Sequence, residues 1–530
     1  MKMMDIMAAS VKVKKVLAGK LKLLVLIIVP VAVTIINCQT GKVVVAEGPL
    51  LPEKEAKIKT EDLYQRGQAE LKKFTNPGYK EAIKYFEQTL RQQPDFYQTY
   101  GRLAVAYGLW ARERKELGLG NLEQWVKGSF YATKAEDLGF HQDYLKASAL
   151  VLNSKTFITD SEYGEIFRFY YHHLREEPAE RLIPYLKDLF ESSSFKYGTV
   201  EPALKNLDEV LKDNPEEPEA LLFKPCVEMM TADDTSLKKV MSLKPEWSLP
   251  YFLLGRFQKL RGEIPEAEKW FKLTLEKNPH HPRALTELGE LAFLDRKYES
   301  AEEFLRQALA LDNELPRAHL LSGFINREKG NYDEALADFR TITLLRPDHE
   351  EGTYHQAIIL IELALWPEAV DSLTTLIKLA GSYEMFGYAL RGLSYLMLGK
   401  LTEAEADCRQ ALTISPGYYL PHYLLGLIYF KKEDFKKARD YFLESLQVDK
   451  TLADGHYYLG QTYLELKMAK EAAEELEKAV ELFKFESRQI DQQMEEALVR
   501  GWTKKVERLA ERKRELEAKI TCCQELLASK

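Results

Sequence analysis

The sequence offers few residue groupings with the spacing that catalysis or metal binding requires. GLSYLMLGK at 392–400 ends in Gly-Lys like a phosphate-binding loop, but six residues separate its glycines where that loop has four. The pairs His172-His173 and His280-His281 are adjacent, and neighbouring residues point to different sides of a helix. No H-E-x-x-H, G-x-S-x-G or C-x-x-C motif occurs. We therefore expect no enzyme, no bound metal and no cofactor.

Cys38 is the residue whose position most clearly suggests chemistry. It follows a run of fourteen uncharged, almost wholly apolar residues, LLVLIIVPVAVTII at 23–36. Before that run stand six lysines and a single aspartate. A basic segment before a short apolar run is typical of an export signal, since a membrane-spanning helix needs roughly 20 apolar residues. We therefore predict that residues 1–37 are a signal peptide or a membrane anchor.

The junction IINCQ at 35–39 resembles the lipobox of bacterial lipoproteins. The resemblance implies cleavage before Cys38, lipidation of its thiol and attachment to the bacterial cell envelope. Asn37 stands where the lipobox has Gly, Ala or Ser, and Ile36 is larger than the usual residue. Two alternatives follow from these departures. One is an uncleaved anchor that makes a single-pass membrane protein, and the other is ordinary cleavage after Ala46.

Net charge narrows the choice of partner. Removal of residues 1–37 takes away six lysines and one aspartate and changes the net charge at pH 7 from −8 to −13. An acidic protein is repelled by nucleic-acid phosphates, so we expect no nucleic-acid partner. Residues 38–59 then form a tether between the membrane and the folded part.

The most regular feature of the sequence is a small residue that recurs about every 34 positions in the second half. The glycines of this series are Gly255, Gly289, Gly323, Gly392, Gly426 and Gly460, with a slip of one residue before Gly392. An alanine recurs at the same interval, twelve positions further along the chain: Ala267, Ala301, Ala335, Ala369, Ala404, Ala438 and Ala472. Such self-similarity indicates a helical repeat array, in which each unit buries its apolar face against its neighbours.

Within one unit, Tyr251, Leu254 and Gln258 have helical spacing, and after a turn Ala267 and Phe271 have it again. The pattern resembles the tetratricopeptide repeat, a helix-turn-helix unit of 34 residues. The resemblance implies an all-α solenoid with seven units in residues 248–486. It also implies a noncatalytic scaffold that binds other proteins.

The first half carries the same pattern in weaker form. Gly67, Ala82 and Phe86 mark one unit with a three-residue insertion. We interpret residues 60–247 as a divergent helical region of the same solenoid. A separate helical domain inserted at about 141–200 is the alternative, and an enzymatic site within 141–247 is the less favoured functional hypothesis.

Residues 487–530 are predicted to form a long C-terminal helix with an apolar seam. The seam residues are Val499, Trp502, Val506, Leu509, Leu516, Ile520, Cys523 and Leu527, interrupted by Lys513. Such a helix either caps the last repeat or forms a coiled coil, which makes a homodimer the alternative. A basic cluster from Arg500 to Arg514 gives it a positive surface that contacts solvent, the acidic repeats or an acidic partner.

In the tetratricopeptide family the first helix of each unit lines a concave groove that holds the ligand. Carried onto this chain, the resemblance gives a groove that is basic and mixed at its start and aromatic and aliphatic further on. The residues expected to bind a partner are Phe252, Arg256, Phe324, Arg327, Tyr354, Ile358, Tyr423, Phe430 and Tyr457. An exposed apolar groove is typical of an interaction site, so we expect a peptide or an amphipathic helix of another protein as the partner.

The lipobox resemblance predicts a definite mature mass. Protein purified from its native membrane should begin at Cys38 and be heavier by an acylated diacylglycerol group, and Cys38→Ala should lack both changes. Intact-mass spectrometry of the two proteins measures this. A full-length, unmodified chain would instead establish an uncleaved signal anchor.

Overall fold

The computed structural model describes residues 59–119, 122–154, 201–228 and 234–528, and every regular element in these ranges is an α-helix. The predicted signal segment 1–37, Cys38 and nearly all of the predicted tether lie outside the described residues. Residues 155–200, most of the segment considered as an inserted domain, lie outside them too. Within the described ranges, no helix combines the length and the apolar character that crossing a bilayer requires.

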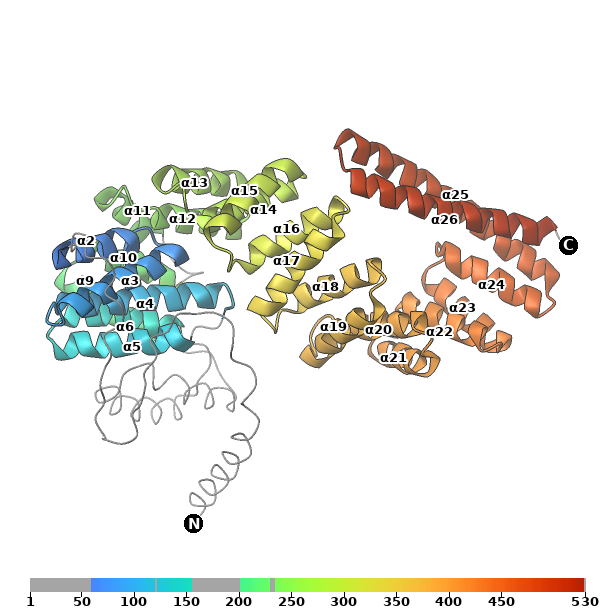
Figure 1. Ribbon diagram of the computed structural model, residues 1–530, viewed down its shortest axis with the longest axis horizontal. Helices are drawn as coiled ribbons and strands as arrows, with labels where there is room; N and C mark the ends of the chain where they lie inside the picture. Colours follow the sequence, from blue (N-terminus) through green and yellow to red (C-terminus); the bar gives the residue numbers. More distant parts are fainter. Residues whose placement is uncertain (1–58, 120–121, 155–200, 229–233, 529–530) are drawn as a thin grey trace, which may run out of the picture. The chain divides into compact units, whose positions relative to one another are not determined.

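Residues 249–499 fold into seven consecutive helix pairs, each made of a first helix, a tight turn and a second helix (Figure 1). The pairs are α12 (Leu249–Leu260) and α13 (Ile264–Lys277), α14 (Pro282–Leu294) and α15 (Tyr298–Leu311), α16 (Pro316–Glu328) and α17 (Tyr332–Leu345), α18 (Glu350–Glu362) and α19 (Trp366–Leu379), α20 (Glu384–Met397) and α21 (Leu401–Ile414), α22 (Tyr419–Lys431) and α23 (Phe435–Val448), and α24 (Ala453–Glu465) and α25 (Ala469–Val499). Proline begins α14 and α16, where its missing N–H costs no helical hydrogen bond. The predicted all-α helix-turn-helix solenoid is confirmed.

A close approach between a small residue and a large side chain holds the two helices of a pair together. A Cβ atom placed on Gly426 would lie 2.5 Å from the ring of Phe442, sixteen positions along the chain. The equivalent distance is 2.6 Å for Gly255 and the ring of Phe271. Both phenylalanines are fully buried. The pair therefore packs at this distance only because the first helix lacks a side chain there.

The N-terminal helices share a hydrophobic core with the first repeats. They are α2 (Thr60–Leu71), α3 (Asn76–Gln92), α4 (Gln98–Glu116), α5 (Leu122–Asp137), α6 (His141–Ser154), α9 (Glu201–Asp213), α10 (Pro218–Glu228) and α11 (Asp234–Leu243). One continuous cluster of buried side chains runs from Tyr64 on α2 to Leu291 on α14. Gly67 faces Phe86 across α2 and α3 as the repeat glycines face their partners.

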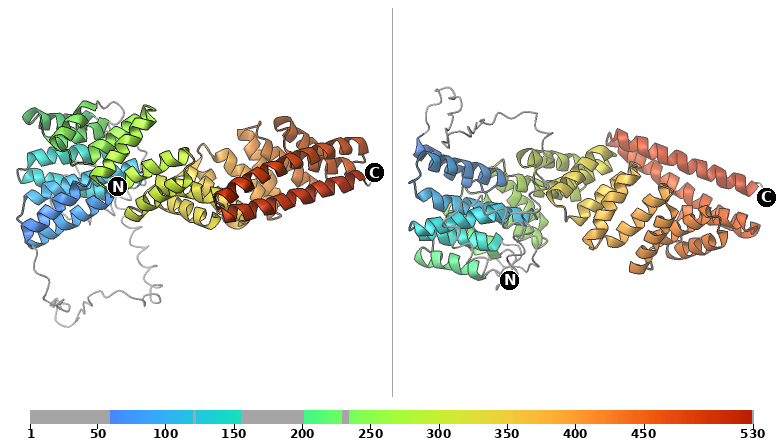
Figure 2. Two further views of the ribbon diagram at one scale, coloured as in Figure 1. Left: turned by 90° about the horizontal axis from the view of Figure 1, so that it is seen from above. Right: turned by 60° about the horizontal axis from the view of Figure 1, so that its bottom comes forward.

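The C-terminal end is a helical hairpin, which differs from the single helix predicted for 487–530. Residues 487–499 continue α25, the chain turns at Gly501 with a φ of +70°, and α26 (Thr503–Ala528) runs back antiparallel to α25 (Figure 2). Leu516 and Cys523 of the predicted seam are fully buried in one cluster with Phe483 and Ile490 of α25. The seam therefore caps the last repeat within the chain, and these side chains are not free to pair with a second copy.

The close approach of the helices makes Gly426 sensitive to substitution. Gly426→Leu should lower the free energy of unfolding by about 1–3 kcal/mol, because the new side chain must displace Phe442 from a packed core. Gly417→Leu is the control, since Gly417 is exposed and an added Cβ meets nothing within 4 Å. Thermal and urea unfolding of both variants measure the effect. Equal stability of the two would contradict the assigned helix contact.

Candidate functional site

The structure places Phe252, the first predicted groove residue, in the core. Its side chain is fully buried, with the ring 5.9 Å from that of Phe271 and 4.8 Å from that of His281. The Arg283 guanidinium lies over the Phe252 ring at 4.9 Å. A partner would have to displace these groups to reach the ring. Phe252 therefore stabilises the first repeat and does not line an accessible groove.

Arg256, the second predicted groove residue, is already paired within the chain. Its guanidinium lies 3.0 Å from the carboxylate of Glu116, at the C-terminal end of α4, and Arg283 lies 2.5 Å from the same carboxylate. Burial alone would raise the pKa of Glu116. The guanidinium groups of Arg112, Arg283 and Arg256 outweigh burial and hold this pKa well below its usual range. The arginines at the start of the predicted groove are therefore already paired with a carboxylate of α4.

A second carboxyl group, Glu113, lies one helical turn before Glu116 and has a different environment. Its side chain is buried, and burial raises its pKa to about 7 although the Arg283 guanidinium lies nearby. The carboxylates of Asp312 and Glu116 contribute to this rise in the pKa, after burial. Glu113 is therefore a buried carboxyl group that gains or loses its proton near neutral pH.

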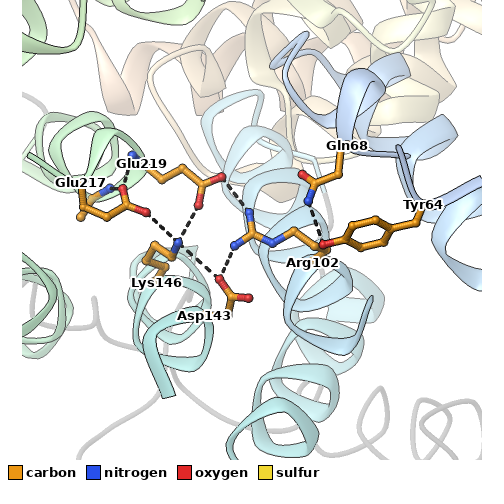
Figure 3. Close-up of polar contacts among 8 residues, drawn as sticks. Tyr64, Gln68, Arg102, Asp143, Lys146, Glu217 and Glu219 are labelled. Atoms are coloured by element: carbon orange, nitrogen blue, oxygen red, sulfur yellow. Dashed lines mark hydrogen bonds and ion pairs between the residues drawn. The ribbon is translucent and has the colours of Figure 1, made fainter. Parts of the chain in front are cut away.

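A buried cluster of charged groups fastens α4, α6 and α10 together (Figure 3). Arg102 on α4 pairs with Asp143 on α6, and also with Glu219 on α10 at 2.8 Å. Lys146 on α6 lies 2.7 Å from Glu219 and 2.9 Å from Glu217. The figure shows the five side chains converging between the three helices. Four of the five residues lie in 141–247, so this cluster bears most directly on the hypothesis of an enzymatic site there.

The pKa shifts in this cluster favour a structural role. Burial would raise the pKa of Glu219, but Arg102 and Lys146 lower it to about 2. Burial lowers the pKa of Lys146, yet the carboxylates around it give a net rise. General acid–base catalysis needs a group whose pKa lies near the working pH, whereas these shifts hold Glu219 and Lys146 charged. The cluster therefore gives no support to an enzymatic site, and residues 155–200 of that segment lie outside the described residues.

In the middle of the array, aromatic side chains of successive inner helices touch one another. The aromatic ladder comprises Phe324 on α16, Tyr354 and His355 on α18, Tyr383 and Phe386 at the start of α20, and Tyr418 just before α22. The centroid distances are 4.7 Å for Phe324–His355, 4.7 Å for Tyr354–Tyr383, 5.9 Å for Tyr354–Phe386 and 5.6 Å for Phe386–Tyr418. All six side chains are partly buried, so each keeps some surface for a partner.

Two other predicted residues lie beside this ladder. Ile358 is partly buried on α18, one helical turn after Tyr354. Arg327, at the end of α16, has no ion pair with another described residue, yet it acts electrostatically on its neighbours. Burial and the Arg327 guanidinium together lower the pKa of His355 to about 4, so this imidazole is neutral at pH 7. The ladder therefore presents aromatic surface with one cation at its edge.

The last three predicted residues are partly buried, like those of the ladder. Tyr423 is partly buried, with its ring 6.0 Å from that of Phe442, and burial raises the pKa of its hydroxyl. The ring of Phe430 lies 6.0 Å from that of Tyr458. The hydroxyl of Tyr457 contacts Cys522 of α26 at 3.4 Å. Tyr457, at the far end of the predicted groove, is therefore in contact with the chain's own C-terminal helix, whereas Tyr423 and Phe430 pack against α23 and α24.

Tyr383 and Tyr418 were not singled out from the sequence. Each stands immediately before an inner helix, at the position that caps it, and neither side chain makes a capping hydrogen bond. Serine, threonine, aspartate and asparagine usually occupy this position. An aromatic residue at the cap of two successive units is thus the signal that would have identified them.

Comparison with known sequences identifies the repeated unit. Models of the tetratricopeptide repeat match residues 261–316, 316–349, 387–418, 419–452 and 453–484. These segments are tetratricopeptide repeats. The resemblance predicted from the glycine and alanine spacing is confirmed for them. Tetratricopeptide repeats are generally noncatalytic scaffolds that bind other proteins.

Several known proteins share this repeat. The chain is 24% identical to human Tetratricopeptide repeat protein 6 over 193 residues, which are 36% of this chain and 36% of that protein. It is 22% identical to TPR repeat-containing protein YpiA of Bacillus subtilis (strain 168) over 344 residues, 59% of this chain and 77% of that one. A solved structure of PilW, a widely conserved type IV pilus biogenesis factor, is 19% identical, with a TM-score of 0.34 over 37% of this chain and 91% of PilW. The chain spans about a third of the human relative's length.

The raised pKa of Glu113 predicts a pH-dependent stability. An unfolded glutamate has a pKa of about 4.3, so between that value and 7 the folded protein holds an extra proton. The stability contributed by neutral Glu113 is fully present below about pH 4.3 and is lost as the pH rises through 7. Glu113→Gln, which stays neutral, should therefore gain on the order of 2 kcal/mol over the wild type between pH 5 and pH 8.

Urea unfolding at several pH values measures this gain. Glu477→Gln, at an exposed position on α25, is the matched control and should show no such trend. A stability difference between Glu113→Gln and the wild type that does not change with pH would show that Glu113 is ionised in the folded protein throughout.

Proposed function

We propose that the chain is a noncatalytic, membrane-tethered scaffold that binds a segment of a partner protein along the aromatic ladder. The observation that carries the proposal is the ladder itself, which runs from α16 to the start of α22 with partly exposed rings. Partly exposed aromatic surface that is continuous over several helices is typical of protein interaction sites.

The dimensions of the ladder favour a polypeptide over a small molecule. Phe324, Tyr354, Phe386 and Tyr418 come from four successive repeats, so one ligand must be long enough to reach several helices. An amphipathic helix presents apolar side chains at intervals of three and four residues and lays them into such a groove. Arg327 at the edge of the ladder suits a carboxylate on the same segment. We infer an amphipathic segment with aromatic or aliphatic anchors as the ligand.

The cellular setting is inferred from the N-terminus. The lipobox-like junction at Cys38 supports a bacterial envelope lipoprotein, in which the repeats would help to assemble or organise an envelope complex. The alternative is a signal-anchored receptor whose repeats face the cytoplasm and bind client proteins. The three cysteines Cys408, Cys522 and Cys523, which form no disulfide with one another, weigh slightly toward this alternative. The mass of the mature N-terminus separates the two.

Site-specific photo-cross-linking tests the ladder directly. A photoreactive phenylalanine analogue at position 386 should give a discrete protein adduct in native membranes. The same analogue at position 485 should give none, because Phe485 is 52% exposed on α25, away from the ladder. Tyr354→Ala should weaken the adduct at 386, since loss of an aromatic anchor costs about 2 kcal/mol or more of binding free energy.

Each variant is checked by thermal unfolding, so that loss of the adduct is not loss of fold. Equal labelling at positions 386 and 485, or an adduct that Tyr354→Ala leaves unchanged in a folded protein, would contradict binding on the ladder.

A further inference from the structure

The helical hairpin α25–α26 is held at both ends, and the two ends differ in kind. At its base, Leu516 and Cys523 of α26 are fully buried against α25, and Lys519 lies 2.5 Å from Asp454 of α24. Tyr457 of α24 belongs to the same apolar cluster. The base is therefore fastened by dry apolar packing that continues the core of the last repeat.

The hairpin tip, defined as residues 500–508, contacts helices α15, α16 and α17 of the second and third repeats. Trp502 packs edge-on against Tyr298 of α15 with the ring centroids 5.4 Å apart. The Arg508 guanidinium lies 3.7 Å above the ring of Tyr332, and its Nε donates a hydrogen bond of 3.1 Å to the carbonyl oxygen of Gly330. The tip thus docks on the turn between α16 and α17.

Two ion pairs with partly exposed side chains flank this contact. Lys504 lies 3.2 Å from Glu334, with 50% and 53% of the two side chains exposed. Lys505 lies 3.2 Å from Glu328, with 23% and 50% of the two side chains exposed. The basic cluster predicted for α26 therefore contacts the acidic repeats. Such pairs are screened by salt, whereas the apolar base of the hairpin is not.

Gly330 shows that the tip fits closely on this turn. Its φ is +79°, and a Cβ added there would lie 2.7 Å from the backbone nitrogen of Lys505. Gly399 occupies the equivalent turn two repeats later with a φ of +74°, and a Cβ added there meets nothing within 4 Å. The two glycines share a backbone conformation, but at Gly330 the missing side chain is also needed to admit α26.

Between its two ends α26 stands away from the inner helices and leaves a cleft of about 730 Å³. Residues on both sides of the cleft are Arg327, Tyr332 and Glu362 from the repeats and Arg508, Leu509 and Arg512 from α26. Arg327 lies one helical turn after Phe324 of the aromatic ladder on α16. The hairpin tip therefore closes the cleft at the end of the ladder where Arg327 lies.

We propose that the hairpin is a clasp that regulates access to the aromatic ladder. Its tip detaches from the turn at Gly330 while its base stays packed on α24, and this widens the cleft beside Arg327 for the partner segment. The inference rests on the proposed binding of a partner at the ladder. The tip is held by two partly exposed ion pairs and by one buried side chain, Trp502, whereas the base rests on an extended apolar cluster. This difference determines which end opens.

Zero-length cross-linking of the full chain tests the clasp without a partner. A carbodiimide joins a lysine to a carboxylate only where the two are in contact, and tryptic mass spectrometry identifies the linked peptides. At low salt we expect links of Lys504 to Glu334 and of Lys505 to Glu328, together with Lys519 to Asp454 at the base. At about 1 M salt, where the screening length is about 3 Å, the two tip links should weaken markedly and the base link should persist.

Gly330→Ala and Gly399→Ala form the matched pair of variants. Both place alanine in the same strained turn, but only Gly330→Ala collides with the backbone of α26. Gly330→Ala should lose both tip links and keep the base link, and Gly399→Ala should keep all three. Tip links that survive Gly330→Ala, that are missing from the wild type at low salt, or that disappear together with the base link would overturn the clasp.

The partner adduct is scored separately from the cross-links. With the photoreactive analogue at position 386, Gly330→Ala should give more adduct than Gly399→Ala. If neither variant gives an adduct, the proposed function fails, while the cross-links still report whether the tip opens. If adduct yields are equal and the tip links are lost only in Gly330→Ala, the clasp opens but does not control access, and the inference fails by itself.

Discussion

The close approach of a small residue on one helix to a buried side chain on the next fixes the geometry of the helix pairs. In three repeats the partner is a phenylalanine, as at Gly323 and Phe339, and in others it is smaller, as at Gly289 and Leu305 or Gly392 and the Cys408 thiol. The residue changes while the close approach stays, because neighbouring units must present matching faces to stack. Once the helices of each pair are held at this distance, the opposite faces of the first helices come together. The aromatic ladder is a consequence of that alignment.

How much of this inner face is available depends on contacts between distant parts of the sequence. Glu116 on α4 forms ion pairs with Arg256 and Arg283 at one end, and α26 contacts Tyr457 at the other. The accessible stretch is what remains between them. The N-terminal helices therefore do more than extend the array, since they set where the groove begins. An isolated set of seven repeats would expose a longer and more basic surface than this chain does.

The sequence predicted the features that depend on local spacing and missed those that depend on distant packing. The helix beginning at Pro282 follows from the repeat register alone. The burial of Phe252 does not, because its ring is covered by His281 and by Arg283 of the next repeat. The turn at Gly501 was missed for another reason. The apolar spacing continues through it, so the seam suggests one helix where φ at a single glycine makes two.

The ion pairs that α4 and α26 make with the repeats differ in how deeply they are buried. Glu116 and Arg283 have 6% and 13% of their side chains exposed, so separating them leaves charges buried without partners, which costs about 3–5 kcal/mol. Lys504 and Glu334 are about half exposed, and separating such a pair costs about 0.2–1 kcal/mol because water replaces each partner. The same kind of ion pair is therefore strong at α4, where it is buried, and weak at α26, where it is exposed. A binding event that supplies about 1–2 kcal/mol is therefore enough to separate Lys504 from Glu334 and leaves Glu116 paired with Arg283.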